Sequence, residues 1–437
     1  MARVAAYGSW RSPIGADLVA RAGVVLSEPW LTAEGVFWLE LRPREGGRSV
    51  VVRADASGAP TDVTPAGFDV RTKVHEYGGG SYLVHDATVF FSNFVDQRLY
   101  RQEPGTPPEP ITPAPPSPGS IRYADGRITP DGSTIVCVRE RRQGDETHND
   151  LALVPADGSG PPLPIASGRD FYAFPRIAPD GSALAWIEWD HPNMPWDGTE
   201  LHVASLSADG LSEDQVVAGG ERESIFQPAW TPAGELCFVS DRTGWWNLYR
   251  RGGEGPQALA PMDAEFGVPM WEFGYSGYDL LDDGRIVCAY RANGIHHLAI
   301  LDPLSGELLD LDIPYTCFDP PYVRARGSQV VFVGGGPTTP DQVVALDLDA
   351  RSVDVLRESE QLSIDPAYLS VPRPIAFPTE GGLTAFGYHY PPANPDHRPP
   401  EGELPPLIVH IHGGPTAEST PELSLGKQFW TSRGFAV

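Results

Sequence analysis

The sequence predicts an all-β seven-bladed β-propeller, followed by the first strands and helix of an incomplete α/β domain. A short turn followed by an apolar strand recurs seven times before residue 360, at intervals of 44 to 53 residues. One four-stranded blade needs about 50 residues, so these recurrences predict seven blades. The chain also has 47 glycines and 46 prolines, as expected of a domain with many turns. A pair of β-sandwiches is the alternative, but it leaves the even spacing unexplained.

The recurring turn is clearest in "TPDGSTIVCV" from Thr129 and "APDGSALAWI" from Ala178. Proline fixes one backbone angle of such a turn and glycine accepts a positive φ, so the next strand starts in a fixed register. The first apolar residues of the seven recurring strands are Val36, Val89, Ile135, Leu184, Leu236, Ile286 and Val330. We expect each of them to begin a buried strand.

The pattern changes after Leu362, where apolar runs at 374–377, 383–390 and 407–411 predict strands separated by a Pro-rich loop at 391–406. The last residues predict a helix capped by Thr420 and ended by Gly434, leading into a new strand at Phe435. We therefore place the propeller in residues 1–365 and the start of an α/β domain in 366–437, which the motif and the resemblance described below imply to be an α/β-hydrolase domain. Segment 1–25 is a candidate for packing on that second domain.

The composition excludes several classes of protein. The net charge is −26 and no basic run occurs, which argues against partners such as nucleic acid or an anionic membrane. The first residues lack a signal-peptide pattern and no apolar stretch is long enough to span a membrane, so we expect a cytoplasmic protein.

The four cysteines are far apart, which predicts buried free thiols, and no metal or cofactor is expected. A homo-oligomer is a candidate assembly.

The first stretch with chemical potential is "HIHGGP", of which His412, Gly413, Gly414 and Pro415 form the loop after a predicted strand. In an α/β-hydrolase, a loop at this place donates backbone N–H groups to the oxyanion of the tetrahedral intermediate, and glycines let the substrate approach closely. The alternative is a turn that needs glycine only for its backbone angles. A metal site on His410 and His412 lacks a third ligand nearby.

A second stretch is "KVHEYGGGSYLV", in which Glu76 and Tyr77 precede three glycines. Glu76 is a candidate for holding a cationic amino group of a substrate at the central channel. The alternative is an inner strand whose glycines serve packing, with Glu76 in an ion pair with Arg71 or Lys73.

A third stretch, "EWDHPNMPWDGTEL" at 188–201, interrupts a predicted blade with prolines and tryptophans. Such a rigid aromatic loop can line a substrate pocket, with Trp196 as an apolar wall and Asp190 or Asp197 as a charged partner. A long hairpin that covers a gap between blades is the alternative.

Taken in order, these stretches resemble the prolyl oligopeptidase family of serine peptidases, most closely its acylaminoacyl-peptidase and dipeptidyl-peptidase-like bacterial members. The resemblance also rests on "YGSWRSPI", "SIFQPAWTPAGELCFVSDRTGWWNLYR" and "FGVPMWEFG", and it covers nearly the whole chain. It implies a propeller that admits short peptides to a hydrolase domain, with His412–Pro415 in the oxyanion-hole loop. It implies more weakly that Glu76 and the Asp190–Asp197 loop face the substrate cavity.

The catalytic Ser, Asp and His of that family have no matching positions here, since no Gly-x-Ser-x-Gly occurs. The nearest approach, "GYSGY" at 274–278, lies in a predicted blade. The resemblance therefore implies a serine-type exo- or oligopeptidase that acts on short peptides by acyl transfer, represented by an N-terminal portion that is inactive alone. A stand-alone propeller used as a binding module and an esterase on the same scaffold are the alternatives.

Overall fold

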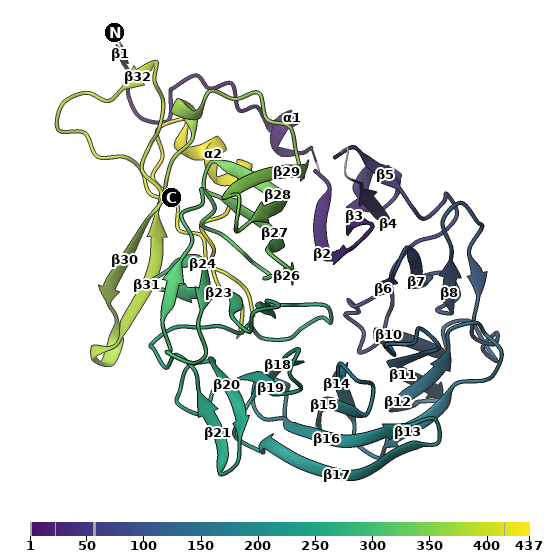
Figure 1. The fold of residues 1–437 in the computed structure, drawn as a ribbon. Helices are drawn as coiled ribbons and strands as arrows, with labels where there is room; N and C mark the ends of the chain where they lie inside the picture. The colour runs from purple at the N-terminus through teal and green to yellow at the C-terminus, as the bar shows by residue number, and fades with distance from the viewer. Residues whose placement is uncertain (1, 22, 56–57, 415) are drawn as a thin grey trace.

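The computed structural model describes residues 2–21, 23–55, 58–414 and 416–437. These residues form seven four-stranded sheets arranged as blades around a ring (Figure 1). Within each blade, neighbouring strands follow one another along the chain and pair antiparallel. Each predicted first apolar residue lies in the second strand of its blade and is at most 8% exposed. The repeat in the sequence therefore marks the turn between the first and second strands, and the seven-bladed prediction is confirmed.

The strands of the first four blades are as follows. Blade 1 consists of β2 (Val25–Thr32), β3 (Gly35–Arg42), β4 (Arg48–Ala54) and β5 (Pro60–Asp62). Blade 2 consists of β6 (Tyr82–His85), β7 (Thr88–Ser92), β8 (Leu99–Gln102) and β9 (Glu109–Pro110). Blade 3 consists of β10 (Ile121–Ile128), β11 (Thr134–Gln143), β12 (Glu146–Pro155) and β13 (Leu163–Ser167). Blade 4 consists of β14 (Phe171–Ile177), β15 (Ala183–Trp189), β16 (Glu200–Ser207) and β17 (Gly210–Gly219).

The remaining three blades repeat the same order. Blade 5 consists of β18 (Ile225–Trp230), β19 (Leu236–Ser240), β20 (Asn247–Gly252) and β21 (Gly255–Ala258). Blade 6 consists of β22 (Tyr278–Leu280), β23 (Ile286–Ala292), β24 (Ile295–Leu301) and β25 (Leu308–Asp310). Blade 7 consists of β26 (Val323–Arg326), β27 (Gln329–Gly336), β28 (Thr339–Asp347) and β29 (Ser352–Glu358). All four cysteines are buried free thiols, as predicted, and three of them lie in second strands.

Polar side chains on the inner strands of blades 1, 3, 5 and 6 connect each of these four blades to the next one. In each case the side chain accepts a hydrogen bond from a backbone N–H in the inner strand of the following blade or in the residues that lead into it. The four bonds are Gly80 to Glu28 (3.0 Å), Phe174 to Asp125 (2.7 Å), Gly277 to Gln227 (2.6 Å) and Ala325 to Asp279 (2.8 Å). Glu28, Asp125 and Gln227 have φ near +50° at a bulge. Bonds of this kind satisfy backbone donors that the ring buries between its sheets.

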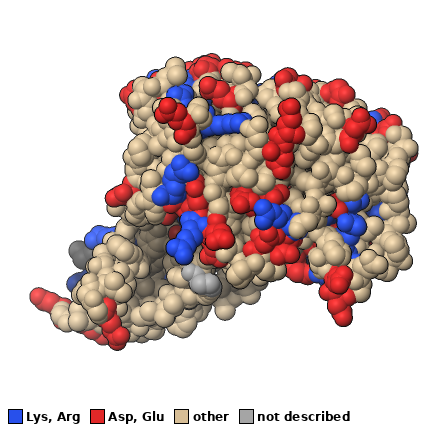
Figure 2. Space-filling view, turned by 90° about the horizontal axis from the view of Figure 1, so that it is seen from below, with Lys and Arg blue, Asp and Glu red and all other residues tan. Residues whose placement is uncertain are grey.

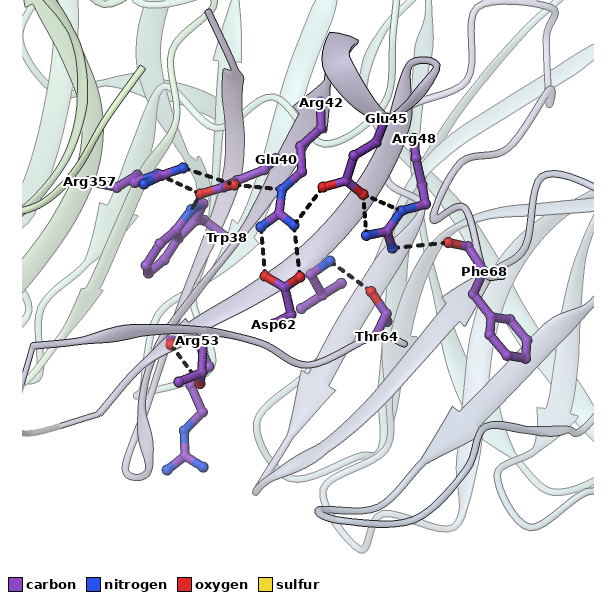
Figure 3. Close-up of polar contacts among 12 residues, drawn as sticks. Trp38, Glu40, Arg42, Glu45, Arg48, Arg53, Asp62, Thr64, Phe68 and Arg357 are labelled. Carbon is purple, nitrogen blue, oxygen red and sulfur yellow. Dashed lines mark hydrogen bonds and ion pairs between the residues drawn. The ribbon is translucent and has the colours of Figure 1, made fainter. Parts of the chain in front are cut away.

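Every blade, including blades 1 and 7, is built from its own continuous part of the chain. The ring is therefore closed by contacts between side chains of blades 1 and 7. Apolar residues of both blades form one buried cluster that includes Trp38 and Val331. Beside it, Arg357 Nε of β29 lies 2.7 Å from the Glu40 carboxylate of β3, which also accepts from Arg42 Nε at 2.9 Å (Figure 3). Glu40 is 1% exposed, and the Trp38 indole N–H donates to it at 3.2 Å. This contact between blades 1 and 7, which we call the seam, therefore combines apolar packing with a buried carboxylate whose two oxygens both have partners.

Two loops from opposite sides of the ring meet near its centre and obstruct the axis (Figure 1). Gly79 forms a parallel bridge with Phe273, and the Phe273 N–H donates to the Gly78 carbonyl at 2.9 Å. Gly78, Gly79 and Gly80 all have positive φ, and a Cβ on Gly79 would lie 2.2 Å from the Phe273 oxygen. The three glycines are therefore required for close backbone approach, which is the packing role considered from the sequence.

Residues 366–437 begin with a hairpin of β30 (Arg373–Pro378) and β31 (Thr384–His389), close to two of the predicted strands. The predicted strand at 407–411 is wrong in extent: among the described residues only Leu407 of this run pairs, with Ala436 in parallel. Val409 and Ile411 are 72% and 80% exposed, because no strand in the described part of the chain covers them. The last residues lie between Leu407 and Tyr390. Ala436 pairs with Leu407, and Val437 and Tyr390 exchange backbone hydrogen bonds at 2.8 and 3.0 Å.

The predicted helix begins later than expected. It is α2 (Leu425–Thr431), capped by Ser424, whose hydroxyl accepts from the Lys427 N–H at 3.4 Å. Thr420 is buried before the helix and does not cap it, because the chain from 420 to 423 is not helical. Gly434 follows the helix with φ +95°, as expected of a residue that ends one. Within the described residues, no helix is both long and apolar enough to cross a membrane.

The N-terminal segment packs on the C-terminal one. β1 (Arg3–Val4) pairs in parallel with β32 (His397–Arg398), and the short helix α1 (Ala16–Val19) follows before blade 1. The Gly8 N–H donates to the Arg433 carbonyl at 2.9 Å. Residues before and after the propeller therefore lie side by side (Figure 1).

Candidate active site

Three aromatic side chains from separate parts of the propeller meet on one face. Trp271, in the segment between blades 5 and 6, lies 4.6 Å from Trp196 and 5.0 Å from Tyr77 between ring centres. Trp196 comes from the Pro-rich loop between β15 and β16, and Tyr77 from the loop before β6. Tyr77 is 59% exposed and both tryptophans are half-buried, so the cluster presents an aromatic surface to solvent. We call Tyr77, Trp196 and Trp271 the aromatic trio.

The chain after the predicted oxyanion loop is attached to this face by two contacts. The Trp271 indole N–H donates to the Thr416 hydroxyl at 2.9 Å, and Arg291 of β23 forms an ion pair with Glu418. His412, Gly413 and Gly414 are exposed just before these contacts. Pro415, the fourth residue of the predicted loop, lies outside the described residues. The loop is therefore held close to the aromatic trio.

The two glycines of the loop are open to approach. A Cβ on Gly413 or on Gly414 would have no heavy atom within 4 Å, and Gly414 has φ +73°. Among the described residues, neither backbone N–H donates a hydrogen bond. Unused N–H donors beside open space are what binding of an oxyanion requires. The nearest polar contact of His412 is between Nδ1 and the Gly413 carbonyl, at 3.4 Å.

Glu76 already has cationic partners, although not those considered from the sequence. Arg122 Nη1 lies 3.2 Å from its carboxylate, and Arg142 also forms an ion pair with it. Arg122 bridges further to the buried Glu140 at 2.9 Å. The negative charge of Glu76 is therefore matched by blade 3 rather than by Arg71 or Lys73.

The two aspartates of the Pro-rich loop have different surroundings. Asp190 accepts from Arg169 Nη1 at 2.7 Å and from the Asp170 N–H at 2.8 Å, and this guanidinium holds its pKa below the usual range against the opposing effect of burial. Asp197 is exposed, and its Oδ2 accepts from the Met194 N–H at 2.9 Å. Its Oδ1 has no partner in the described part of the chain. Asp197 is therefore the more available of the two for a ligand.

A cluster of possible metal ligands lies nearby in blade 4. The ligand atoms of Glu188, Glu200 and His202 lie within 4.8 Å of one another. Arg169 occupies the space between the two carboxylates, with Nε 3.0 Å from Glu188 and Nη2 2.6 Å from Glu200. The positive charge that these groups require is thus supplied by the protein's own guanidinium.

The sequence did not single out Trp271, Thr416 or Arg291 as site residues. "FGVPMWEFG" contributed only to the family resemblance, and a tryptophan there gives no local signal of its partners. Ser276 of "GYSGY" is 1% exposed and donates to the Val323 carbonyl at 2.8 Å, so it is a structural hydroxyl of the ring.

A hollow of about 820 Å³ lies elsewhere, beside the seam of blades 1 and 7. It is lined by charged and apolar residues of these two blades and not by the aromatic trio. On the side of the molecule seen in Figure 2, acidic side chains are spread over the surface with basic ones between them. Surface charge therefore does not mark one site on this side.

Comparison with solved structures gives close matches over almost the whole chain. A Mycobacterium tuberculosis puromycin-hydrolyzing peptidase matches with a TM-score of 0.92 and 40% identity, over 99% of this chain and 68% of that one. A puromycin hydrolase matches with a TM-score of 0.91 and 36% identity over the same shares. A serine-to-alanine mutant of puromycin hydrolase, complexed with PGG, matches with a TM-score of 0.90 and 35% identity, again over 99% and 68%.

A prolyl endopeptidase shares the fold, with a TM-score of 0.67 at 11% identity over 95% of this chain and 61% of its own. No protein-family model and no curated protein matches the sequence.

Proposed function

Since the chain belongs to the prolyl oligopeptidase family of peptidases, we propose that it forms the substrate-binding propeller and the oxyanion loop of a serine-type peptidase. The reaction is acyl transfer from short peptides: a serine attacks the carbonyl, a histidine moves the proton, and backbone N–H groups stabilise the oxyanion. Gly413 and Gly414 supply those N–H groups. The serine, aspartate and histidine come from outside the 437 residues, so the chain alone is inactive.

The observation that carries this proposal is the position of the loop. Trp271 and Arg291 hold Thr416 and Glu418 against the propeller, and the loop that precedes them has open glycines with unused donors. A peptide whose reacting carbonyl lies at the Gly413 N–H would have its side chains near the aromatic trio. A propeller that served only as a binding module has no need of exposed donors at this place.

The surroundings favour short substrates with an apolar or aromatic residue and a free amino group. The aromatic trio offers a surface for the side chain, and Asp197, next to Trp196, has a carboxylate oxygen available for the amino group. In this proposal Asp190 and Glu76 lie farther from the substrate than the aromatic trio and Asp197. Their carboxylates position Arg169, Arg122 and Arg142. Because the glycine loop and Phe273 obstruct the axis, the substrate reaches this face from the side rather than through the ring.

The first test uses the whole enzyme, with amide and ester substrates and with puromycin, the compound named for two relatives. Gly413→Ala narrows the approach to the oxyanion donors, and we expect a loss of about tenfold or more in kcat/KM with an unchanged unfolding midpoint. Gly253→Ala is a matched control, since Gly253 also has open space around its Cβ position but lies in a turn of blade 5. Equal activity of the two variants would contradict the role of the loop. Ester turnover without amide turnover would favour an esterase.

The second test asks whether the chain of 437 residues has an activated serine. We expect no covalent labelling by a fluorophosphonate, because "GYSGY" places its serine inside the ring and no nucleophile motif is present. Stoichiometric labelling of the purified chain would show that the catalytic serine is already present in it.

A further inference from the structure

Three arginines occupy the same place in three different blades. Arg127 of β10, Arg176 of β14 and Arg324 of β26 lie on inner strands around the axis. Their partners across the blade are Val136, Ala185 and Val331, each one residue after the first apolar residue of the repeat. The repeat therefore brings three guanidinium groups together from residues about 50 and 150 positions apart.

The three guanidiniums line a cavity of about 210 Å³ together with Trp30, Trp230 and Asp279. Those of Arg127 and Arg324 lie 5.1 and 5.7 Å from the ring centre of Trp30, and that of Arg176 lies 4.9 Å from the ring of Phe174. Stacking on an aromatic face fixes the plane of a guanidinium while leaving its edges available for hydrogen bonds. The side chains of Arg127 and Arg176 are 19% and 12% exposed, so solvent reaches the cavity.

Most of the donors of these arginines are unused. A guanidinium has five N–H donors. In the described residues, the hydrogen bonds and ion pairs of these three guanidiniums involve Nη1 alone. They join Nη1 to the carbonyls of Gly126, Pro175 and Val323 at 2.7, 2.9 and 3.0 Å, and to Asp125 at 3.5 Å from Arg127 and 3.2 Å from Arg176. The Nε and Nη2 groups of each are left for a ligand.

The local charge favours an anion. Asp125 faces Arg127 and Arg176, and Asp279 accepts from the Leu280 and Ala325 N–H groups at 2.9 and 2.8 Å. Glu28 is the third acid, and burial raises its pKa to about 8, so it is mostly neutral at pH 7. Three positive charges therefore face at most two negative ones. Burial and then repulsion by Arg176 lower the pKa of Arg127 to about 9, which a bound anion would relieve.

The cavity is separate from the candidate active site. β14 starts at Phe171, which stacks on Trp189 beside the Pro-rich loop, and ends at Ile177, which lines the cavity. Seven residues of strand span about 20 Å. The bridge between Gly79 and Phe273 lies across the axis between the two faces.

We propose that this axial cavity binds a small oxyanion of the phosphate class. Three guanidiniums that converge from different blades match the several oxygens of a tetrahedral anion, and each can offer a pair of parallel N–H donors. A volume of about 210 Å³ holds one phosphate group and a few waters, given roughly 30 Å³ for each water. The ligand is free phosphate or the phosphate end of a larger metabolite.

The test measures binding of inorganic phosphate to the chain of 437 residues by calorimetry, with acetate and a neutral-ended tripeptide carboxylate as separate arms at matched ionic strength. We expect one saturable phosphate site and a rise in the thermal unfolding midpoint that chloride does not reproduce. A phosphomonoester that binds more tightly than inorganic phosphate would identify a larger metabolite as the ligand. Binding of the carboxylates without binding of phosphate would overturn the assignment, as would an effect of phosphate that chloride reproduces.

Two variants separate binding from a purely structural role of the arginines. Arg324→Gln removes one fork and should weaken phosphate binding at least tenfold, and Arg176→Lys keeps the charge but loses the paired donors and should also weaken it. Arg285→Gln, which removes an exposed arginine paired with Asp283, is the control and should bind like the wild type. Folded Arg324→Gln and Arg176→Lys proteins with wild-type phosphate affinity would refute the site.

Discussion

The pH dependence of stability at Glu28 tests how strongly the ring buries its inner polar groups. Its side chain accepts from the Gly80 N–H at 3.0 Å and the residue is 6% exposed. Burial raises its pKa from 4.5 to about 8, and the nearby Glu272 and Asp125 add to the effect. In the folded protein Glu28 therefore keeps its proton at neutral pH, whereas in the unfolded chain it loses the proton above about pH 4.5.

The sign of the effect follows from this difference. Below pH 4.5 both states are protonated, and Glu28 does not make stability depend on pH. Between pH 4.5 and 8 only the unfolded state releases the proton, so the free energy of unfolding falls as the pH rises. Each difference of one in pKa corresponds to about 1.4 kcal/mol, which gives a loss of about 5 kcal/mol by pH 8 and a constant difference above it.

Glu28→Gln removes this titration and keeps the shape of the protonated side chain. Denaturant unfolding at pH 5, 7 and 9 should show the variant gaining stability over the wild type by about 3 kcal/mol between pH 5 and 7, and by about 4 kcal/mol between pH 5 and 9. Gln227 already occupies the equivalent bulge of blade 5 as a neutral amide, so Gln227→Glu should introduce a similar loss. Glu307→Gln, at an exposed position, is the control. Parallel pH curves for wild type and Glu28→Gln would refute the reasoning.

Three further changes test the axis, the seam and the attachment of the oxyanion loop. Gly79→Ala places a Cβ against backbone at positive φ, and we expect a loss of about 3 kcal/mol or more in thermal unfolding experiments. Arg357→Gln leaves the buried Glu40 with fewer partners and should cost about 1 to 3 kcal/mol, whereas the double variant with Glu40→Gln should recover part of the loss; equal stability of all three proteins would argue against the seam ion pair. Trp271→Phe removes the indole N–H that holds Thr416, so amide exchange should accelerate at 416–418 while the blades keep their protection, and unchanged exchange there would show that this bond does not attach the segment.

The propeller could be predicted in detail because its information is local and repeated. The recurring turns and the first apolar residues indicate where each second strand begins, and six intervals of 44 to 53 residues exclude most other topologies. The second region was harder. The run at 407–411 has the composition of a buried strand, but strand formation depends on neighbours, and only Leu407 has one. The sequence predicts the N-cap at Thr420, whereas the helix is capped by Ser424, because serine and threonine are both favoured at this position and local sequence does not separate them.

The candidate site could be predicted only in part, because its contacts join residues far apart in the chain. The glycines of the predicted oxyanion loop and the tryptophan of the Pro-rich loop had local signals in the sequence. Trp271 had none, since its role comes from Thr416, 145 residues away. The partners of Glu76 were also missed, because Arg122 and Arg142 approach it from the next blade rather than from its own loop.

The chain enters and leaves the ring at neighbouring points, so the propeller could be exchanged as one unit. The Val24 N–H donates to the Ser359 carbonyl at 3.0 Å, so the two ends of the propeller lie one hydrogen bond apart. A short linker could join them, and new ends could be opened in the exposed turn at Gly144 to give a circular permutant that keeps all seven blades. The same proximity allows the whole ring to be transplanted between members of the family with only two splice points, which would test the role in substrate binding that we propose for the propeller.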